Sequence, residues 1–114
     1  MDKRKKAHAI SSLRRGTYKW PGRWKAEKRS HVGRGEYLCE SCGWISKKKD
    51  MAMDHIVPVV DPEKGWDGFD SFIDRLFVDE DGWQRLCDLC HGIKTKAENL
   101  IRKETSKKAK KEKA

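Results

Sequence analysis

The chain of 114 residues lacks any long hydrophobic run, and only 36% of its residues are hydrophobic. No apolar segment approaches the about 20 residues that a helix needs to cross a bilayer, which excludes an integral membrane protein. The basic segment 1–6 leads into no apolar stretch of the kind found in secretory signals, so we expect a cytoplasmic protein. In that compartment, cysteine pairs bind metal more often than they form disulfides.

The chain also has little material for a self-sufficient core. A domain of this size buries only about two-thirds of its unfolded surface and is marginal without a staple. Charged residues make up 39% of the sequence, against the usual ~25%. The four cysteines are the candidates for that staple.

Positive charge is concentrated at both ends of the chain, whose formal net charge is +9. Residues 1–29 carry +9 and residues 102–114 carry +5, whereas residues 30–101 carry −5. The basic ends would attract a polyanion such as nucleic acid, and the central carboxylates suggest a bound cation. We therefore divide the chain into a basic arm (1–16), a folded domain (17–101) and a basic tail (102–114), for which the composition predicts disorder.

The patterns of hydrophobic and turn-forming residues predict an α+β domain. The expected elements are, in chain order, an imperfect helix or flexible arm over 1–16, a helix over 21–29, a hairpin around 37–46, a strand over 51–57, a helix over 66–77, a short strand over 83–86 and a helix after residue 90. We expect Trp20 and Trp24 to pack against the core.

The cysteines form two C-x-x-C pairs, Cys39/Cys42 and Cys87/Cys90, separated by 44 residues. Such a pair places two sulfurs on one tetrahedral ion, so two pairs in a chain with no other cysteine favour a structural zinc that clamps the two segments together. Two disulfides would require an oxidising compartment. Rubredoxin-like iron would leave the carboxylates and the basic ends unexplained. The c-type haem motif, Cys87 to His91, would leave the other pair unused.

Asp54 and His55 lie in the expected strand over 51–57, where alternation would point them to opposite faces unless a bulge or twist intervenes. A single histidine in a strand is more often a packed, hydrogen-bonded residue than a reactive one. Zinc linkage would, however, bring His91 close to this strand. A carboxylate and an imidazole form part of an open divalent-cation site, and a second, free imidazole can deprotonate water.

Several motifs taken together resemble the HNH endonucleases, and especially the small zinc-stapled HNH proteins of tailed bacteriophages. The motifs are Asp54-His55-Ile56-Val57-Pro58, Leu86-Cys87-Asp88-Leu89-Cys90-His91 with Lys94-Thr95, and both cysteine pairs. Trp20-Pro21, Arg34-Gly35, Val59-Val60-Asp61-Pro62 and Arg75-Leu76-Phe77 are also typical of the phage group. The resemblance covers about residues 17–101.

The resemblance implies a ββα-metal fold, or His-Me finger, in which two strands and a helix hold one catalytic divalent ion. By matching position, His55 would be the general base, Asp54 and His91 would ligate the ion, and the four cysteines would hold the structural zinc. The catalytic ion would polarise the scissile phosphate and stabilise the leaving 3′ oxygen, which leaves a 5′-phosphate and a 3′-hydroxyl. Mg²⁺, Mn²⁺, Ni²⁺ and Zn²⁺ are all candidates for it.

One position departs from the family pattern. The middle Asn of the family lies nine residues before the final His, and that position here is Gly82. Asp81 or Gln84 would have to replace it, and Asp81 is the better ligand for a hard cation. We expect the site to remain active with a weaker or altered metal preference.

The sequence thus predicts a metal-dependent DNA endonuclease or nickase of low sequence specificity. Its phosphate contacts are expected from Arg14, Arg15, Lys19, Arg23, Lys25, Lys28, Arg29 and Lys94. The protein is expected to be a monomer, which with one active site would nick first. From the resemblance, a terminase that cuts and packages phage DNA is a candidate partner.

Two other functions fit parts of the sequence. A non-catalytic, zinc-containing DNA-binding or scaffold protein is supported by the missing Asn, and it predicts that binding survives His55→Ala while no metal restores cutting. An RNA binder or RNase is a third hypothesis, which comparison of RNA and DNA cleavage would distinguish.

Overall fold

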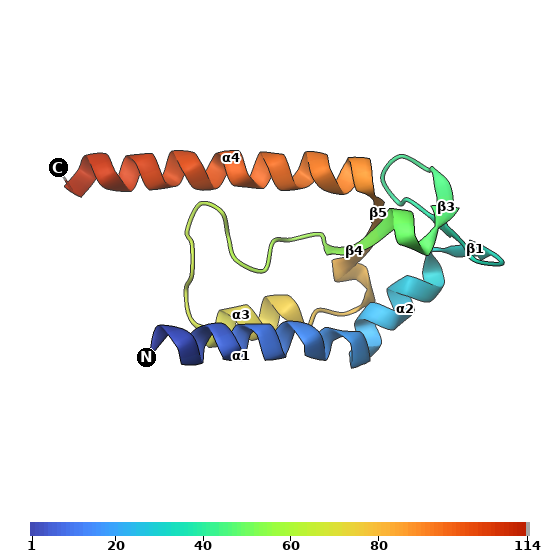
Figure 1. Ribbon diagram of the computed structural model, residues 1–114, viewed down its shortest axis with the longest axis horizontal. Coiled ribbons are helices and arrows are strands. Elements are labelled where there is room, and N and C mark those ends of the chain that lie inside the picture. The colour runs from blue at the N-terminus through green and yellow to red at the C-terminus, as the bar shows by residue number, and fades with distance from the viewer. Residues whose placement is uncertain (114) are drawn as a thin grey trace.

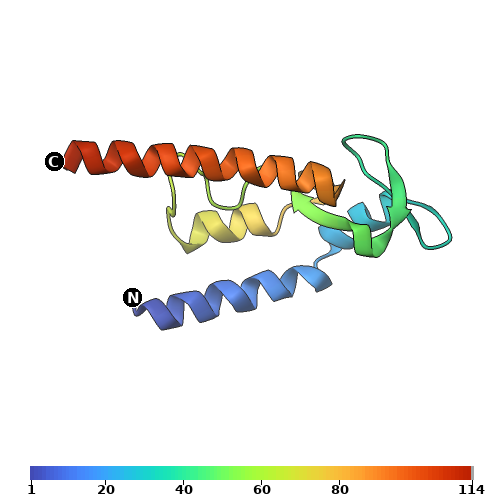
Figure 2. The ribbon, with the colours of Figure 1, turned by 45° about the horizontal axis from the view of Figure 1, so that its top comes forward.

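The computed structural model describes residues 1–113, which contain four α-helices and five short strands. The helices are α1 (Lys3–Gly16), α2 (Pro21–Arg29), α3 (Phe69–Leu76) and α4 (Asp88–Lys113), and the strands are β1 (His31–Gly33), β2 (Glu36–Leu38), β3 (Ile45–Lys47), β4 (Met51–His55) and β5 (Trp83–Cys87). The α+β class is confirmed. The molecule measures 56 × 27 × 22 Å, and Figures 1 and 2 show both termini at one end and β1–β3 at the other.

The two N-terminal helices begin where their sequence favours a helix start. Asp2 caps α1 by accepting the N–H of Arg4 at 2.7 Å, and Pro21 occupies the first turn of α2, where a missing N–H costs nothing. Of the two alternatives for residues 1–16, a helix or a flexible arm, the structure has the helix. The predicted bounds of the helix over 21–29 are confirmed.

The two tryptophans beside α2 have different surroundings. The Trp20 indole N–H donates to the carbonyl of Val78 at 2.6 Å, and its ring packs edge-on against Phe77 at 5.4 Å between centroids. Trp24 is 40% exposed, with the Lys28 ammonium 4.9 Å from its ring centroid. The prediction of core packing is thus wrong for Trp24, which lies on the outer side of α2.

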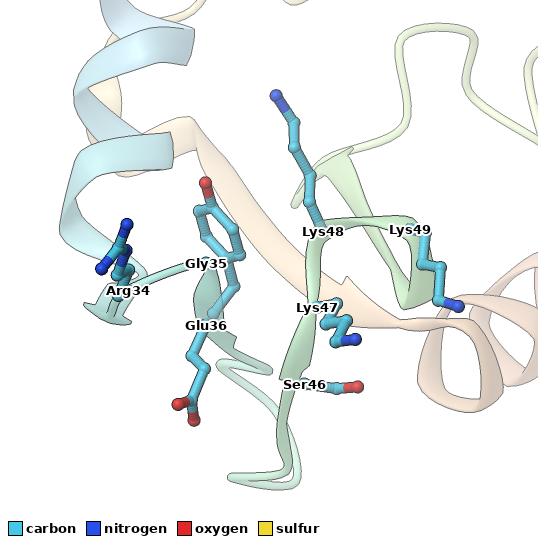
Figure 3. Close-up of a pocket in the computed structure, with 8 residues that line it drawn as sticks. Arg34, Gly35, Glu36, Ser46, Lys47, Lys48 and Lys49 are labelled. Atoms are coloured by element: carbon cyan, nitrogen blue, oxygen red, sulfur yellow. The ribbon is translucent and has the colours of Figure 1, made fainter.

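Strands β1, β2 and β3 form an antiparallel sheet in that order, and the segment between β2 and β3 carries the first cysteine pair. Gly43 closes that turn with φ +80°, and its N–H donates to the carbonyl of Cys39 at 2.9 Å. The expected hairpin around 37–46 is therefore confirmed. After Lys47 the chain makes a short 3₁₀ turn, Lys48–Asp50, and enters β4 (Figure 3).

Strand β4 pairs with β5 along its whole length, from Met51 opposite Cys87 to His55 opposite Trp83. The strand predicted over 51–57 ends two residues early, because β5 begins at Trp83 and the residue before it belongs to a 3₁₀ turn, Glu80–Gly82. One further backbone bond, from Ile56 N–H to the Gly82 carbonyl at 3.0 Å, closes the ladder.

Two small hydrophobic clusters replace one large core. The first surrounds the cysteines and contains Cys39, Met51, Leu86 and Cys87. The second is centred on Val59, Phe72 and Leu76 and packs α3 against Ile10 and Leu13 of α1. The end of β4 reaches this second cluster, because His55 hydrogen-bonds the carbonyl of Leu76. A cavity lined by both residues, here called the cleft, lies at this end.

Helix α3 is shorter than the predicted helix over 66–77. Gly68 has φ +108°, which no helix contains, and the first helical bond runs from Phe72 N–H to the Gly68 carbonyl at 3.1 Å. Trp66 still packs on Phe69 and Phe72, at 5.0 and 5.2 Å between centroids. Trp66 therefore shares the packing surface of α3 although it lies outside the helix.

Helix α4 continues without interruption to Lys113, through most of the segment 102–114 for which the composition predicts disorder. No Gly or Pro follows Gly92, and most of the tail consists of Lys, Ala and Glu, which are good helix formers. Ala114 lies outside the described residues. Although α4 is long, neither it nor any other helix in the described range is apolar enough to cross a membrane.

Candidate functional site

The four cysteines meet at one point, as their spacing predicts. Cys39 follows β2, Cys42 lies in the hairpin turn, Cys87 ends β5 and Cys90 lies in the first turn of α4. Their sulfurs all lie within 4.8 Å of one another, with Cys42 Sγ 3.8 Å from Cys87 Sγ. Sulfurs at about 2.3 Å from a tetrahedral zinc ion are about 3.8 Å apart. The four free thiols can therefore hold a structural metal such as zinc.

The thiols in this cluster have very different proton affinities. Burial acts to raise the pKa of Cys39, but N–H groups of Cys42, Cys87 and Ser41 donate to its sulfur and lower the pKa to about 6. The hydrogen bond with Cys87 raises the pKa of Cys90 to about 12. Since metals bind the thiolate, a divalent cation is the group that would allow all four sulfurs to be deprotonated together.

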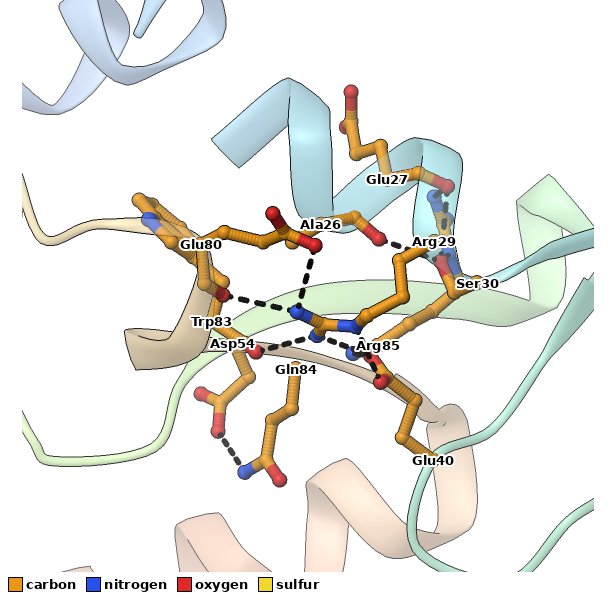
Figure 4. Close-up of polar contacts among 10 residues, drawn as sticks. All are labelled: Ala26, Glu27, Arg29, Ser30, Glu40, Asp54, Glu80, Trp83, Gln84 and Arg85. Carbon is orange, nitrogen blue, oxygen red and sulfur yellow. Dashed lines mark hydrogen bonds and ion pairs between the residues drawn. The ribbon is translucent and has the colours of Figure 1, made fainter. Parts of the chain in front are cut away.

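Glu40, inside the first C-x-x-C pair, ties the hairpin to β5 and α2 (Figure 4). Its N–H donates to the Arg85 carbonyl at 2.8 Å, and its carboxylate accepts the Arg85 N–H at 2.9 Å. The Arg29 guanidinium donates to both carboxylate oxygens of Glu40 at 2.9 Å and to the Trp83 carbonyl at 2.8 Å. One side chain of α2 thus holds both the cysteine turn and the far end of β5.

Arg29 and Arg85 are structural cations in this network. The hydrogen bond to Glu40 raises the pKa of Arg29, and its guanidinium is paired with the Glu40 carboxylate at 2.9 Å. Arg85 is buried, its Nε donates to Ser30 Oγ at 2.6 Å, and its guanidinium lies 4.2 Å from the Tyr37 ring centroid. No local sequence pattern indicates this network, because its partners lie up to 58 positions apart.

A second candidate site is a cavity of about 500 Å³ where the end of β4, the start of α4 and the junction of α1 and α2 meet. Asp54 and His55 both line it, together with Trp83 and His91. Alternation along β4 does not separate Asp54 from His55 here, because the strand ends at His55. The three residues predicted to form the catalytic centre are therefore brought to one cavity.

His55 is held with one ring nitrogen fixed. Its Nε2 lies 2.9 Å from the Leu76 carbonyl oxygen, so Nε2 carries the hydrogen and Nδ1 is the nitrogen that can accept a proton. The ring lies 4.0 Å from the Trp83 ring between centroids. Burial lowers the pKa of His55, although the bond to Leu76 and the charge of Asp54 oppose the shift. The neutral imidazole is the form that a general base needs.

Asp54 is the polar hub of the cavity. Its Oδ1 lies 3.8 Å from His91 Nε2, and its Oδ2 lies 3.0 Å from Lys94 Nζ. Gln84 on β5 donates to the same Oδ2 at 3.2 Å. The carboxylate is only 17% exposed, so these partners provide much of its solvation.

The donors of Asp54 and His91 fit a divalent ion in part. Two atoms that are each about 2.1 Å from an ion lie at most about 4.2 Å apart, so the 3.8 Å between Oδ1 and Nε2 is compatible with one shared ion. Lys94 occupies the other carboxylate oxygen and would share Asp54 with that ion. Further coordination positions would be filled by water or phosphate.

The structure shows why residue 82 has no side chain, and it places Gln84, not Asp81, next to Asp54. A Cβ at Gly82 would lie 2.5 Å from Val78 Cγ2, so the Asn that the HNH resemblance leads one to expect at this position does not fit this backbone without a shift of Val78. Asp81 lines a different cavity, beside Pro21 and Lys25 of α2, and is not brought to Asp54 and His91. Gln84, the weaker candidate from the sequence, is the one that contacts Asp54.

Of the predicted phosphate-binding residues, Arg14, Arg15 and Arg23 line the cavity and Lys19 does not. Arg23 Nη1 donates to Thr17 Oγ1 at 2.7 Å, and its Nε is a buried donor without a hydrogen-bond partner among the described residues. Lys94 faces the cavity's carboxylate and Glu98, 2.6 Å away, so it is already paired. Arg23 Nε lies 3.7 Å from Glu27 Oε1, so this cation is paired as well. Among the described side chains, the free positive charge at the cavity comes from Arg14 and Arg15.

Comparisons with protein-family models, with curated proteins and with solved structures give no match for this chain. Any function of the two sites is therefore inferred from their motifs and geometry.

Proposed function

We propose that the protein is a metal-dependent endonuclease of the HNH type that hydrolyses DNA phosphodiester bonds, with zinc in the cysteine cluster. The observation that carries the proposal is the convergence of Asp54, His55 and His91 in one arginine-lined cavity, with His55 Nε2 fixed on a backbone carbonyl. The pair β4–β5 followed directly by α4 is the order of elements expected for a ββα-metal fold.

His55 acts as the general base. Its Nδ1 takes a proton from a water molecule, whose oxygen attacks the phosphorus while the bond from phosphorus to the 3′ oxygen breaks. The Leu76 carbonyl holds the opposite nitrogen, which fixes both the tautomer and the ring orientation. The depressed pKa of His55 keeps the base unprotonated at neutral pH.

Asp54 and His91 would hold the catalytic cation. When bound, such an ion polarises the scissile phosphate and stabilises charge on the leaving 3′ oxygen. Gln84 and Lys94 orient the Asp54 carboxylate by donating to its Oδ2. This leaves Oδ1, on the side of His91, as the oxygen directed at the ion.

Three arginines would bind the DNA backbone beside the reacting phosphate. Arg14 and Arg15 end α1 and Arg23 lies in α2, so the cavity receives positive charge from two helices. Such contacts raise the local concentration of DNA and set its position without reading the bases.

A non-catalytic, zinc-containing DNA-binding or scaffold protein is the second candidate, and one observation favours it. Lys94 lies 3.0 Å from Asp54 Oδ2 and supplies the positive charge that a metal would otherwise supply. If this ion pair persists in the presence of divalent cations, the cavity binds phosphate and does not hydrolyse it.

Conversion of supercoiled plasmid to nicked and linear forms distinguishes the two candidates. We expect cutting by zinc-loaded protein with Mg²⁺, Mn²⁺ or Ni²⁺ and none with EDTA. His55→Ala should lower the rate by about 10²- to 10⁴-fold with DNA binding and zinc content unchanged. His8→Ala, a change at an exposed histidine of α1, is the matched control and should keep the full rate.

Other outcomes separate the remaining hypotheses. DNA binding without cutting, under every metal, would support the scaffold candidate. Preferential cutting of an RNA duplex would replace the DNA assignment. The terminase partner is proposed on the resemblance alone, and a pull-down from infected cells that recovers no terminase, together with normal packaging by a deletion phage, would contradict it.

A further inference from the structure

Four basic side chains line a cavity of about 660 Å³ on the hairpin, at the start of β4, whereas Asp54 and His55 lie at the end of that strand. The four side chains are Arg34, in the turn between β1 and β2, and Lys47, Lys48 and Lys49, which end β3 and form the turn into β4 (Figure 3). We call this group the hairpin patch. Glu36 is the one carboxylate that lines the cavity, and none of the four cations forms an ion pair with a side chain that the structure describes.

The absence of partners is notable because the patch lies in the acidic part of the chain. Residues 30–101 carry a net charge of −5, and several of their other cations are neutralised or buried. Arg75 pairs with Asp67, Lys94 pairs with Asp54 and Glu98, and Arg85 is buried against Tyr37. Four unpaired cations that repel one another are stabilised most by a polyanion that contacts several of them together.

A smaller cavity extends from the hairpin patch toward α2. A cavity of about 290 Å³ is lined by Trp24 and Lys28 of α2 and shares Tyr37 and Lys48 with the hairpin patch. Helix α2 thus carries Lys28 beside the hairpin patch and Arg23 beside the cavity of Asp54 and His55. Trp24 adds exposed aromatic surface between them in the sequence.

We infer that the hairpin patch is a second contact for the DNA backbone, which holds the duplex on the far side of the cleft. Strand β4 connects the two surfaces, and its four steps of about 3.3 Å separate its ends by about 13 Å, or about four base pairs at 3.4 Å each. A single duplex can therefore contact both surfaces. The inference rests on the proposed function for the identity of the polyanion, but it concerns binding and needs no catalysis.

The salt dependence of DNA affinity tests the inference. The variant is Lys48→Gln/Lys49→Gln, two positions outside the strand ladders, and the matched control is Lys64→Gln/Lys96→Gln, two exposed lysines with the same change in charge. For a short duplex and zinc-loaded full-length protein, the plot of log affinity against log salt should become shallower by about 1.8 in the hairpin variant, since each lost phosphate contact removes about 0.9. The control should keep the wild-type slope. Arg34→Gln, which should lose about 0.9, repeats the test at a position in another turn.

The possible outcomes distinguish failure of the hairpin patch from failure of the proposed nuclease activity. Equal slopes for both double variants and for Arg34→Gln, with zinc content and circular dichroism unchanged, would overturn the hairpin patch and leave the nuclease intact. Wild-type binding with the predicted slopes but no cutting under any metal would overturn the nuclease and support the patch. No DNA binding by the wild-type protein would overturn both.

Discussion

The cysteine cluster and the cleft lie at opposite ends of the same two strands and are built in opposite ways. At one end Met51 pairs with Cys87, and the chain supplies four sulfurs within 4.8 Å of one another. At the other end His55 pairs with Trp83, and Asp54 and His91 supply two donors 3.8 Å apart, beside the side chains of Arg14 and Arg15. The first site can complete a metal's coordination from the chain alone, and the second cannot.

This difference is what one expects between a structural metal site and the catalytic site that we propose. A closed, four-ligand shell leaves no position for substrate, whereas an open shell leaves positions for water and phosphate. Arg29 links the two ends of the β4–β5 pair. Its guanidinium donates to Glu40 in the cysteine turn and to the carbonyl of Trp83, which pairs with His55. Changes at the closed end should therefore act on folding, and changes at the open end on chemistry.

Loss of a cysteine gives the largest expected effect and tests the closed site. Structural zinc contributes about 10–16 kcal/mol to small metal-bound domains, more than the total stability of about 5–15 kcal/mol of a typical protein. Cys87→Ser should therefore abolish stoichiometric zinc and native circular dichroism. His91→Ala, at the open site, should keep one zinc per chain and the native spectrum. A folded, zinc-free Cys87→Ser protein would remove the distinction between the sites.

Removal of Arg29 tests the connection between the two ends. Arg29→Met leaves the Glu40 carboxylate and the Trp83 carbonyl without this donor, which should cost about 2 kcal/mol. Arg75→Met is the matched control, because the exposed pair of Arg75 with Asp67 should contribute less than about 1 kcal/mol. Urea unfolding at saturating zinc measures both, and equal losses would show that Arg29 has no special structural role.

Substitution of Gly82 tests why the open site lacks the family Asn. A Cβ there meets Val78 Cγ2 at 2.5 Å, so Gly82→Ala should destabilise the protein by about 1–3 kcal/mol. Gly92→Ala, where a Cβ meets nothing and the backbone is helical, should stabilise by about 0.5–1 kcal/mol. Thermal unfolding compares the two, and an unchanged stability in Gly82→Ala would mean that Val78 yields readily and that Asn is excluded for another reason.

The titration of His55 is the smallest expected effect. Burial lowers its pKa below the ordinary value of 6.5, so the native state binds the proton more weakly than the unfolded state does. The neutral His55 therefore contributes to the free energy of unfolding above pH 6.5. That contribution should decrease as the pH falls from 6.5 to the lower pKa of the folded state. Ring chemical shifts, assigned by the resonance missing in His55→Asn, give the midpoint directly. A midpoint at or above 6.5 would contradict the buried, neutral base.

Local sequence patterns predicted the features that depend on local chemistry. Two C-x-x-C pairs predicted the cysteine cluster, Pro21 predicted the start of α2, and the hairpin followed from the cysteine turn with Gly43. Asp54, His55 and His91 were found from motif positions, and the strand and helix that carry them bring them to one cavity.

The features that sequence patterns missed depend on partners far along the chain. The pairing of Arg29 with Glu40 cannot be read from a local window, because the two residues are 11 positions apart. Asp81 is adjacent to Gly82 in the sequence, but the fold places it in a cavity beside Pro21 and Lys25 of α2. The tail over 102–114 was judged by its charge, whereas helix propensity and the absence of Gly and Pro determine its structure through Lys113.

Stepwise metal removal tests the division of roles most directly. Dialysis against a mild chelator should leave one zinc per chain and a native circular dichroism spectrum while plasmid cutting stops, and addition of Mg²⁺ or Mn²⁺ should restore cutting in the wild-type protein but not in His55→Ala. Cutting that persists in the zinc-only protein, or zinc that leaves together with the activity, would contradict two separate sites.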